Sequence, residues 1–139
     1  MQLILCLDDR NGISFGGRRQ SRDRAVCKKC IELTANSKLW MSVYSGGIFT
    51  EYADRILVAD NFLDKADKSD FCFVENCNFV TKLDYVDRIV LFRWNRHYPA
   101  DTYFPVDLND GTWNKCNMEN FTGNSHERIT MEEYIRCND

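Results

Sequence analysis

Apolar residues occur in short runs along this chain, and the first run is the most continuous. Residues 3–8, LILCLD, contain no charged residue before Asp8, which is typical of a strand buried on both faces of a sheet. Later runs predict further strands at residues 38–44, 54–59, 70–75, 87–94, 101–108 and 128–136. Short helices or turns near residues 46–52 and 77–84 would connect some of these strands.

The pattern changes to a helical period from Ser21 onwards. Val26, Cys30 and Leu33 fall on one face of this segment, as in a helix that packs against a sheet. Ser21 or Asp23 is the candidate N-cap, because a short oxygen-bearing side chain accepts hydrogen bonds from the free amides of a first turn. Strands that alternate with helical segments favour the α/β class.

Size and composition fit one globular domain over residues 1–139. The formal net charge of −3 argues against a general nucleic-acid-binding surface, although it leaves room for a local basic patch. No segment approaches the ~18 apolar residues that a membrane helix needs, and the apolar start MQLILCL meets charged residues too soon for a signal peptide. We therefore expect a cytoplasmic protein with no membrane partner, whose seven cysteines are reduced.

The most distinctive segment is residues 11–24, NGISFGGRRQSRDR. Two glycine-containing turns are followed there by four arginines within seven residues. Guanidinium groups bind phosphate or carboxylate in bidentate fashion, and the free amides of a helix start also attract anions. The segment therefore predicts a site for an anionic small molecule, with a solvated helix start as the alternative. The candidate residues are Arg18, Arg19, Gln20, Ser21, Arg22, Asp23 and Arg24.

A second basic segment, residues 92–101 (FRWNRHYPAD), interleaves aromatic and cationic side chains. Such interleaving suits base stacking and phosphate contacts, with Trp94 and Arg96 as the candidate residues. The alternative is a strand of period two, in which Phe92 and Trp94 face the core and the residues between them face solvent.

Several stretches, in this order, resemble the dihydrofolate reductase family. They are LILCLDDRNGISFGG, KLWM, FCFVEN, DRIVLF, DTYFPVDL followed by Trp113, and SHERITMEEY. The resemblance spans nearly the whole chain and implies an α/β fold: a dihydrofolate reductase-like central mixed β-sheet flanked by helices, shortened in the cofactor-binding half. It also implies that residues 18–24 and 93–98 border one cleft.

The chain departs from this family where the family binds its ligands. The resemblance makes Asp23 the nearest match to the carboxylate that holds the pterin, and it places Ile13 on the nicotinamide wall, but Phe92 replaces a threonine. Residues 42–45 lack the phosphate-binding arginine, and the paired glycines beside the pyrophosphate fall at Glu75-Asn76. A like-charge pair ~4 Å apart costs about 4 kcal/mol at a surface-like dielectric before relaxation. We therefore expect a scaffold that has lost NADPH and uses no cofactor.

The chain also resembles a group of small bacterial proteins that carry an automated ribonuclease Z label. Such di-zinc hydrolases need a His-x-His-x-Asp-His motif and further histidines. This chain has two histidines, His97 and His126, and neither lies in such a motif, so the sequence does not support that activity. We interpret His126 as a structural anchor of the last hairpin, and we do not interpret Ser21 as a nucleophile without a histidine beside it.

The cysteines offer one further site. Cys27 and Cys30 form a CxxC pair, and Cys72 with Cys77 provides a second pair. Four thiolates can bind zinc, and a CxxC pair can be redox-active. The helical pattern places Cys27 and Cys30 on or beside the apolar face, however, which favours core packing.

Three functions follow from these observations. The first is a non-reductase domain that binds an anionic small molecule at an arginine-rich cleft. The second is an NADPH-dependent reductase of dihydrofolate or of a related pterin or pyrimidine, with Asp23 as the substrate acid. The third is a module that places the basic loop on an acidic partner or on RNA.

Overall fold

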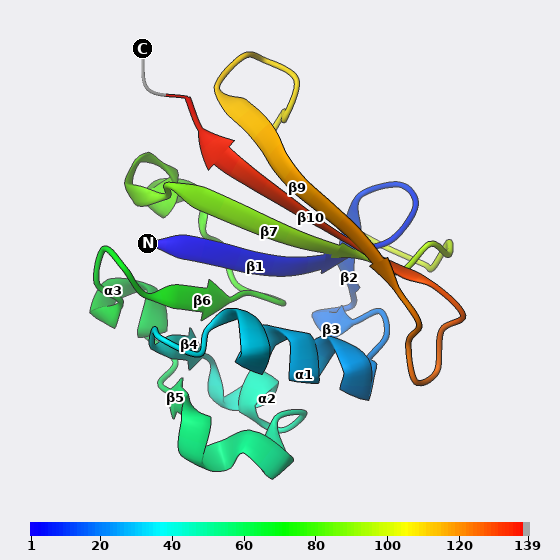
Figure 1. Cartoon of the computed structure of the whole chain (residues 1–139), viewed down its shortest axis with the longest axis horizontal. Helices are drawn as coiled ribbons and strands as arrows, with labels where there is room; N and C mark the ends of the chain where they lie inside the picture. The colour runs from blue at the N-terminus through cyan, green and yellow to red at the C-terminus, as the bar shows by residue number, and fades with distance from the viewer. Residues whose placement is uncertain (138–139) are drawn as a thin grey trace.

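A seven-stranded mixed sheet forms the centre of the computed structural model, which describes residues 1–137 (Figure 1). Its strands are β1 (Gln2–Leu7), β4 (Leu39–Met41), β5 (Ile56–Val58), β6 (Phe71–Phe73), β7 (Arg88–Arg93), β9 (Trp113–Phe121) and β10 (Ile129–Arg136). They lie in the order β5-β4-β6-β1-β7-β10-β9. The strands from β5 to β7 are parallel, whereas β10 runs antiparallel to both of its neighbours. The predicted α/β class and mixed sheet are therefore confirmed.

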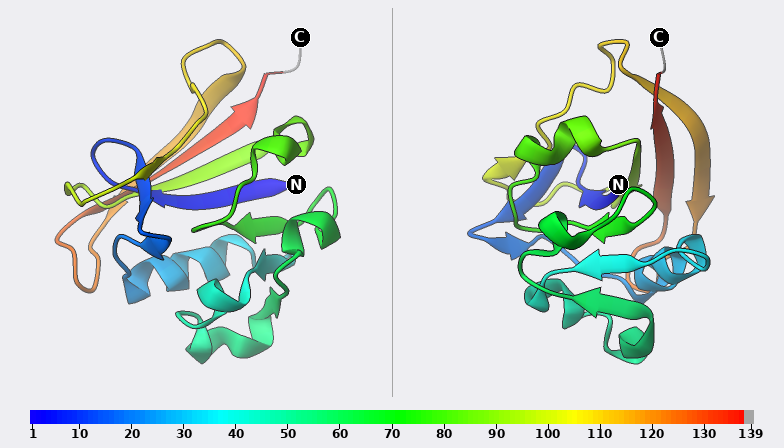
Figure 2. Two further views of the ribbon diagram at one scale, coloured as in Figure 1. Left: turned by 180° about the vertical axis from the view of Figure 1, so that it is seen from behind. Right: turned by 90° about the vertical axis from the view of Figure 1, so that its left-hand side faces the viewer.

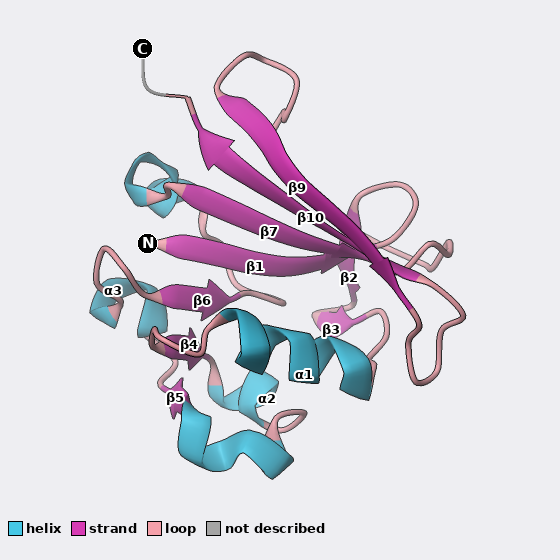
Figure 3. Cartoon of the chain, in the orientation of Figure 1, coloured by secondary structure: helices cyan, strands magenta, loops and turns pink. Residues whose placement is uncertain are grey.

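A small sheet and several short helices complete the fold (Figure 3). The small sheet has the order β3-β2-β8, with strands β2 (Gly12–Phe15), β3 (Arg18–Arg19) and β8 (Thr102–Tyr103). The α-helices are α1 (Arg24–Leu33), α2 (Val43–Gly46) and α3 (Phe62–Lys65), and the 3-10 helices are η1 (Thr50–Arg55) and η2 (Val80–Tyr85). None of the helices in the described part of the chain has the length and apolar character needed to cross a membrane.

The two faces of the large sheet are covered by different elements (Figure 2). Along β1, Leu3 and Leu5 belong to one core cluster and Ile4 to the other, because successive side chains of a strand point to opposite faces. Helix α1 covers the second face through Val26 and Cys30. Elements α3 and η2 pack against the first. The continuous apolar run at the start of the sequence is thus a strand buried on both faces, as predicted.

Two strand predictions need correction. The predicted strand at 101–108 is reduced to the two residues of β8, because Pro105 has no amide to donate and the backbone amide of Phe104 instead bonds to Asn11 O. Strand β9 was not predicted at all. Its sequence, WNKCNMENF, is polar and mostly exposed, because β9 is an edge strand of the large sheet. Such a strand shows no alternation of apolar and polar residues.

The four cysteines that form the two sequence pairs lie in two different places. Cys27 and Cys30 are buried under α1, whereas Cys72 and Cys77 pack in the cluster on the opposite face of the sheet. Burial raises the pKa of Cys27 to about 11 and that of Cys72 to about 12. The core-packing interpretation of Cys27 and Cys30 is confirmed by their burial, and within residues 1–137 no group of three or more His, Cys, Asp or Glu side chains is placed to hold a metal ion.

Replacing Leu5 tests the central position of β1. Leu5→Ala should lower the free energy of unfolding by about 2–5 kcal/mol, because it opens a cavity in a side-chain layer that has no exposure. The matched control is Leu57→Ala on the edge strand β5, where the side chain is 38% exposed and the change should stay below about 1 kcal/mol. Urea denaturation followed by tryptophan fluorescence measures both, and equal losses would contradict this arrangement.

Candidate functional site

The parallel strands β4, β6 and β1 end at one edge of the large sheet, where open α/β sheets commonly bind ligands. At the end of β1, Asp8 is 1% exposed and accepts four hydrogen bonds. Its Oδ1 accepts from the amides of Arg10 and Gly12, both at 2.8 Å. Its Oδ2 accepts from Gln20 Nε2 at 3.0 Å and from the amide of Tyr98 at 3.2 Å. Although burial opposes the charge, these donors hold the pKa of Asp8 below its ordinary value.

Asp8 therefore holds the two basic segments of the sequence close to each other. It holds Gln20 from the first segment and the backbone at Tyr98 from the second. Gln20 also donates to the carbonyl oxygen of Pro99 at 3.3 Å. Segments about eighty residues apart in the chain are thus neighbours at the carboxyl end of β1.

Arg19 is bound by a carboxylate from the end of β6. Its Nε lies 2.9 Å from Glu75 Oε2 and its Nη2 lies 3.0 Å from Oε1, and the Ser45 hydroxyl donates to the same Oε1 at 2.8 Å. The guanidinium group also stacks on the Tyr44 ring, 4.0 Å from its centroid. Glu75 is therefore a neutralised, hydrogen-bonded carboxylate.

A pocket of about 410 Å³, which we call the carboxyl-edge pocket, lies beside this ion pair. The small sheet contributes Ile13, Ser14 and Tyr103 to its walls, the turn between β2 and β3 contributes Gly17, and Phe79 comes from the start of η2. Ser14, which is 2% exposed, is one of the polar residues that line this pocket.

The four arginines of the first segment do not converge on this pocket. Arg18 is exposed and is not among the residues that line the pocket, although it follows Gly17, which is. Arg22 is also exposed, and neither Arg18 nor Arg22 forms an ion pair within the described part of the chain. Arg24 is paired with Glu51, with an Nε–Oε1 distance of 3.1 Å. The structure thus does not bring the four arginines together around one ligand site.

The candidates from the second segment lie elsewhere. Trp94 is 3% exposed, and its ring stacks on His126 with 4.5 Å between centroids. The prediction that Phe92 and Trp94 face the core is confirmed. Arg96 is exposed and lines a separate surface pocket with Arg128.

Asp23 faces a loop rather than the pocket. Of the two predicted N-cap candidates, Ser21 and Asp23, it is Asp23 that caps α1. Its fully buried side chain accepts from the amides of Ala25, Asn124 and Ser125, all at 2.8 Å. His126 Nδ1 lies 2.9 Å from Oδ2. Burial opposes ionisation, but these donors lower the pKa of Asp23 to about 2. A carboxyl group with that pKa stays ionised near neutral pH and is not a proton donor to substrate.

His126 connects Asp23 to two hydroxyl groups. Its Nε2 lies 2.9 Å from Tyr98 Oη and 3.2 Å from Ser21 Oγ. Together these contacts hold the loop before β10 against the start of α1, which is an anchoring role of the kind expected for His126. The histidine beside Ser21 could not be found from the sequence, because the two residues are 105 positions apart.

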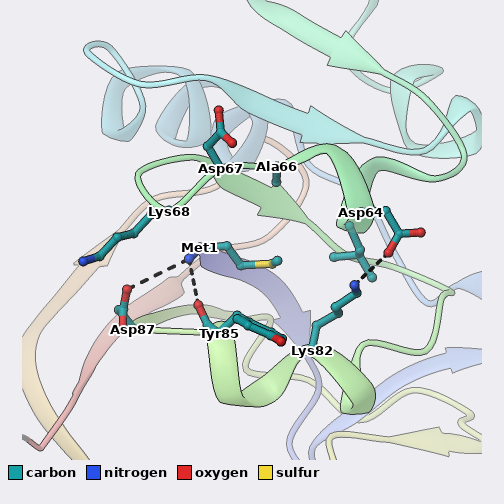
Figure 4. Close-up of a pocket in the computed structure, with 9 residues that line it drawn as sticks. Met1, Asp64, Ala66, Asp67, Lys68, Lys82, Tyr85 and Asp87 are labelled. Carbon is teal, nitrogen blue, oxygen red and sulfur yellow. Dashed lines mark hydrogen bonds and ion pairs between the residues drawn. The ribbon is translucent and has the colours of Figure 1, made fainter.

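A second pocket of about 410 Å³ opens at the opposite edge of the large sheet (Figure 4). Four of its charged groups form two ion pairs. Lys82 Nζ lies 2.7 Å from Asp64 Oδ1, and the amino group of Met1 lies 4.0 Å from Asp87 Oδ2. This pocket contains none of the residues that the sequence singled out, so the carboxyl-edge pocket is the better candidate.

Comparison with known proteins supports the fold. No protein-family model matches the sequence, and no curated protein matches it. Among solved structures, dihydrofolate reductase from Enterococcus faecalis, complexed with NADP(H) and RAB-propyl, is similar with a TM-score of 0.68. The match covers 99% of this chain and 96% of that chain at 16% sequence identity. The chain therefore has a dihydrofolate reductase-like fold, as the resemblance implied, and an identity this low shows the fold alone.

The Asp23 carboxylate should make stability depend on pH in acid. Its folded-state pKa of about 2 lies below the ordinary value of 3.8, so its contribution is complete above pH ~4 and is lost as the pH falls to about 2. Asp23→Asn should lower the free energy of unfolding by about 1–3 kcal/mol at pH 7, because the buried donors lose a charged acceptor. It should also remove this part of the pH dependence.

Urea denaturation at pH 7, 4 and 2 measures both effects. The exposed Asp84→Asn provides a control with the same change in charge. If the two variants had the same stability profile, the hydrogen bonds of Asp23 would not contribute to folding.

Proposed function

We propose that this chain is a small-molecule-binding domain that works without NADPH. The observation that carries the proposal is the carboxyl-edge pocket, which the nearly buried Ser14 helps to line. Phe79 and Tyr103 offer rings to the apolar body of a ligand. The exposed Arg18, which follows the lining residue Gly17 in the chain, is the cation that would bind a phosphate or carboxylate group. The proposed ligand is thus an anionic molecule with an apolar or aromatic body.

The residues at this edge do not fit NADPH. The paired glycines of the reductase family correspond to Glu75 and Asn76, and the Glu75 side chain takes up the space between Arg19 and Ser45. Displacing Glu75 from Arg19 would leave a nearly buried carboxylate without its cation, which costs about 3–5 kcal/mol. No cationic side chain lies in residues 42–45 to hold a phosphate. Each of these features opposes a dinucleotide.

Thermal shift assays against nucleotides, folates and sugar phosphates test the binding proposal. A ligand present at about 100 times its Kd should stabilise the folded state by about 2.7 kcal/mol and raise Tm. Arg18→Gln should weaken binding roughly tenfold, because it removes a charge-assisted contact. Arg22→Gln makes the same change in charge and should leave the affinity unchanged.

Ser14→Ala should also weaken binding, because the ligand would lose the partner for its polar group. The pocket proposal is wrong if no compound raises Tm, or if Arg18→Gln and Arg22→Gln affect binding equally. A complex that instead forms with RNA and weakens steeply with salt would favour the basic loop as a nucleic-acid surface.

The proposal that this chain does not use NADPH is tested separately. We expect no transfer of fluorescence from the protein's tryptophans to NADPH, and no oxidation of NADPH with dihydrofolate above the rate without protein. Asp23 supports this expectation, since it faces residues 124–126 and not the pocket. Saturable binding of NADPH in the micromolar range would contradict the proposal and restore the reductase alternative.

A further inference from the structure

We propose that Ser21, His126 and Asp23 form a nucleophilic serine centre that hydrolyses small carboxylic esters. The distances are those of a serine–histidine–carboxylate relay: 3.2 Å from Ser21 Oγ to His126 Nε2, and 2.9 Å from His126 Nδ1 to Asp23 Oδ2. These residues are not among those that line the carboxyl-edge pocket. This proposal is therefore independent of the proposed ligand site in the carboxyl-edge pocket.

Asp23 is the positioning residue of this centre. Its side chain has no exposure, and three backbone amides fix its carboxylate at the start of α1. A fixed carboxylate next to Nδ1 selects the tautomer that carries its proton on Nδ1. The lone pair of His126 Nε2 then faces the hydroxyl groups on the other side of the ring.

Packing holds the imidazole in this orientation. The ring of His126 stacks on Trp94 with 4.5 Å between centroids and meets Tyr98 edge-on at 6.4 Å. The His126 side chain is only 2% exposed, so its neighbours hold the ring in place. A base preorganised in this way meets the geometric requirement for deprotonating a serine.

Tyr98 supplies the remaining group. Its Oη lies 2.9 Å from His126 Nε2 and 3.4 Å from Ser21 Oγ. When Ser21 donates to Nε2, the Tyr98 hydroxyl donates to Ser21 Oγ, and it can transfer this hydrogen bond to the carbonyl oxygen of an ester that Oγ attacks. It is therefore placed to stabilise the oxyanion that forms when Oγ attacks a carbonyl. Ser21 itself is partly exposed, so an ester can reach it.

The reaction balances with water as the co-reactant. Ser21 Oγ forms a bond to the carbonyl carbon as its proton passes to His126 Nε2, and the bond between that carbon and the alkoxide leaving group then breaks. The leaving group takes the proton from Nε2 and departs as an alcohol. Water, deprotonated by Nε2, cleaves the acyl–serine ester and regenerates Ser21. The net change is ester plus water to carboxylic acid plus alcohol.

Labelling with a fluorophosphonate, followed by intact mass spectrometry, tests whether Ser21 is activated. We expect one adduct on the wild-type chain and at least a ~100-fold lower labelling rate in Ser21→Ala. The control is Ser69→Ala, which removes an exposed hydroxyl outside the relay and should label at the wild-type rate. Circular dichroism confirms that the variants are folded.

Hydrolysis of p-nitrophenyl acetate provides the second measurement. Tyr98→Phe keeps the ring but removes the oxyanion donor, so it should lower kcat about 10²–10³-fold with little change in KM. A purely structural network would give no such split, since its loss would alter stability and not turnover. The proposal is overturned if the wild-type chain forms no adduct, or if the adduct persists in Ser21→Ala.

Discussion

Strand β1 is covered on both faces, and residues Leu3–Leu5 have no exposure at all. A strand in that position has no room for a polar side chain, so polar groups can first gather where it ends. Asp8 is the first of them, and its two oxygens satisfy four donors from three separate loops. Those hydrogen bonds determine where the small sheet begins and where residues 96–98 pass. These loops contribute residues to the carboxyl-edge pocket and to the cluster of Ser21, His126 and Asp23.

Ion pairs within the chain decide which arginines of residues 18–24 can bind a ligand. Arg19 is bound by Glu75, 56 positions away, and Arg24 by Glu51, 27 positions away. The exposed Arg24–Glu51 pair contributes little to stability, because solvent screens it. The Arg19–Glu75 pair is largely shielded from water, so breaking it leaves an unpaired charge. A count of arginines therefore overstates how much positive charge is free to bind a ligand.

The sequence was sufficient where a signal is local. Continuous apolar runs located β1 and β7, the position of Asp23 located the cap of α1, and the order of motifs indicated the sheet. Strand β9 escaped prediction because an exposed edge strand has no apolar face, and its pairing with β10 depends on tertiary contacts. The Ser21–His126 contact escaped for a related reason. A distance of 105 positions leaves no periodic or spacing signal in a single sequence.

Two nearly buried carboxylates, Glu75 and Asp23, are both held by hydrogen bonds within the chain. Glu75 is bound by the Arg19 guanidinium group and by the Ser45 hydroxyl group. Asp23 is saturated by backbone amides and by His126, so it is not free to protonate a substrate. The two carboxylates differ in the groups to which they connect. Glu75 ends its network at Arg19, whereas Asp23 acts through an imidazole on a hydroxyl group at the surface. Any covalent chemistry of this chain is therefore expected at Ser21, and reversible binding beside Glu75.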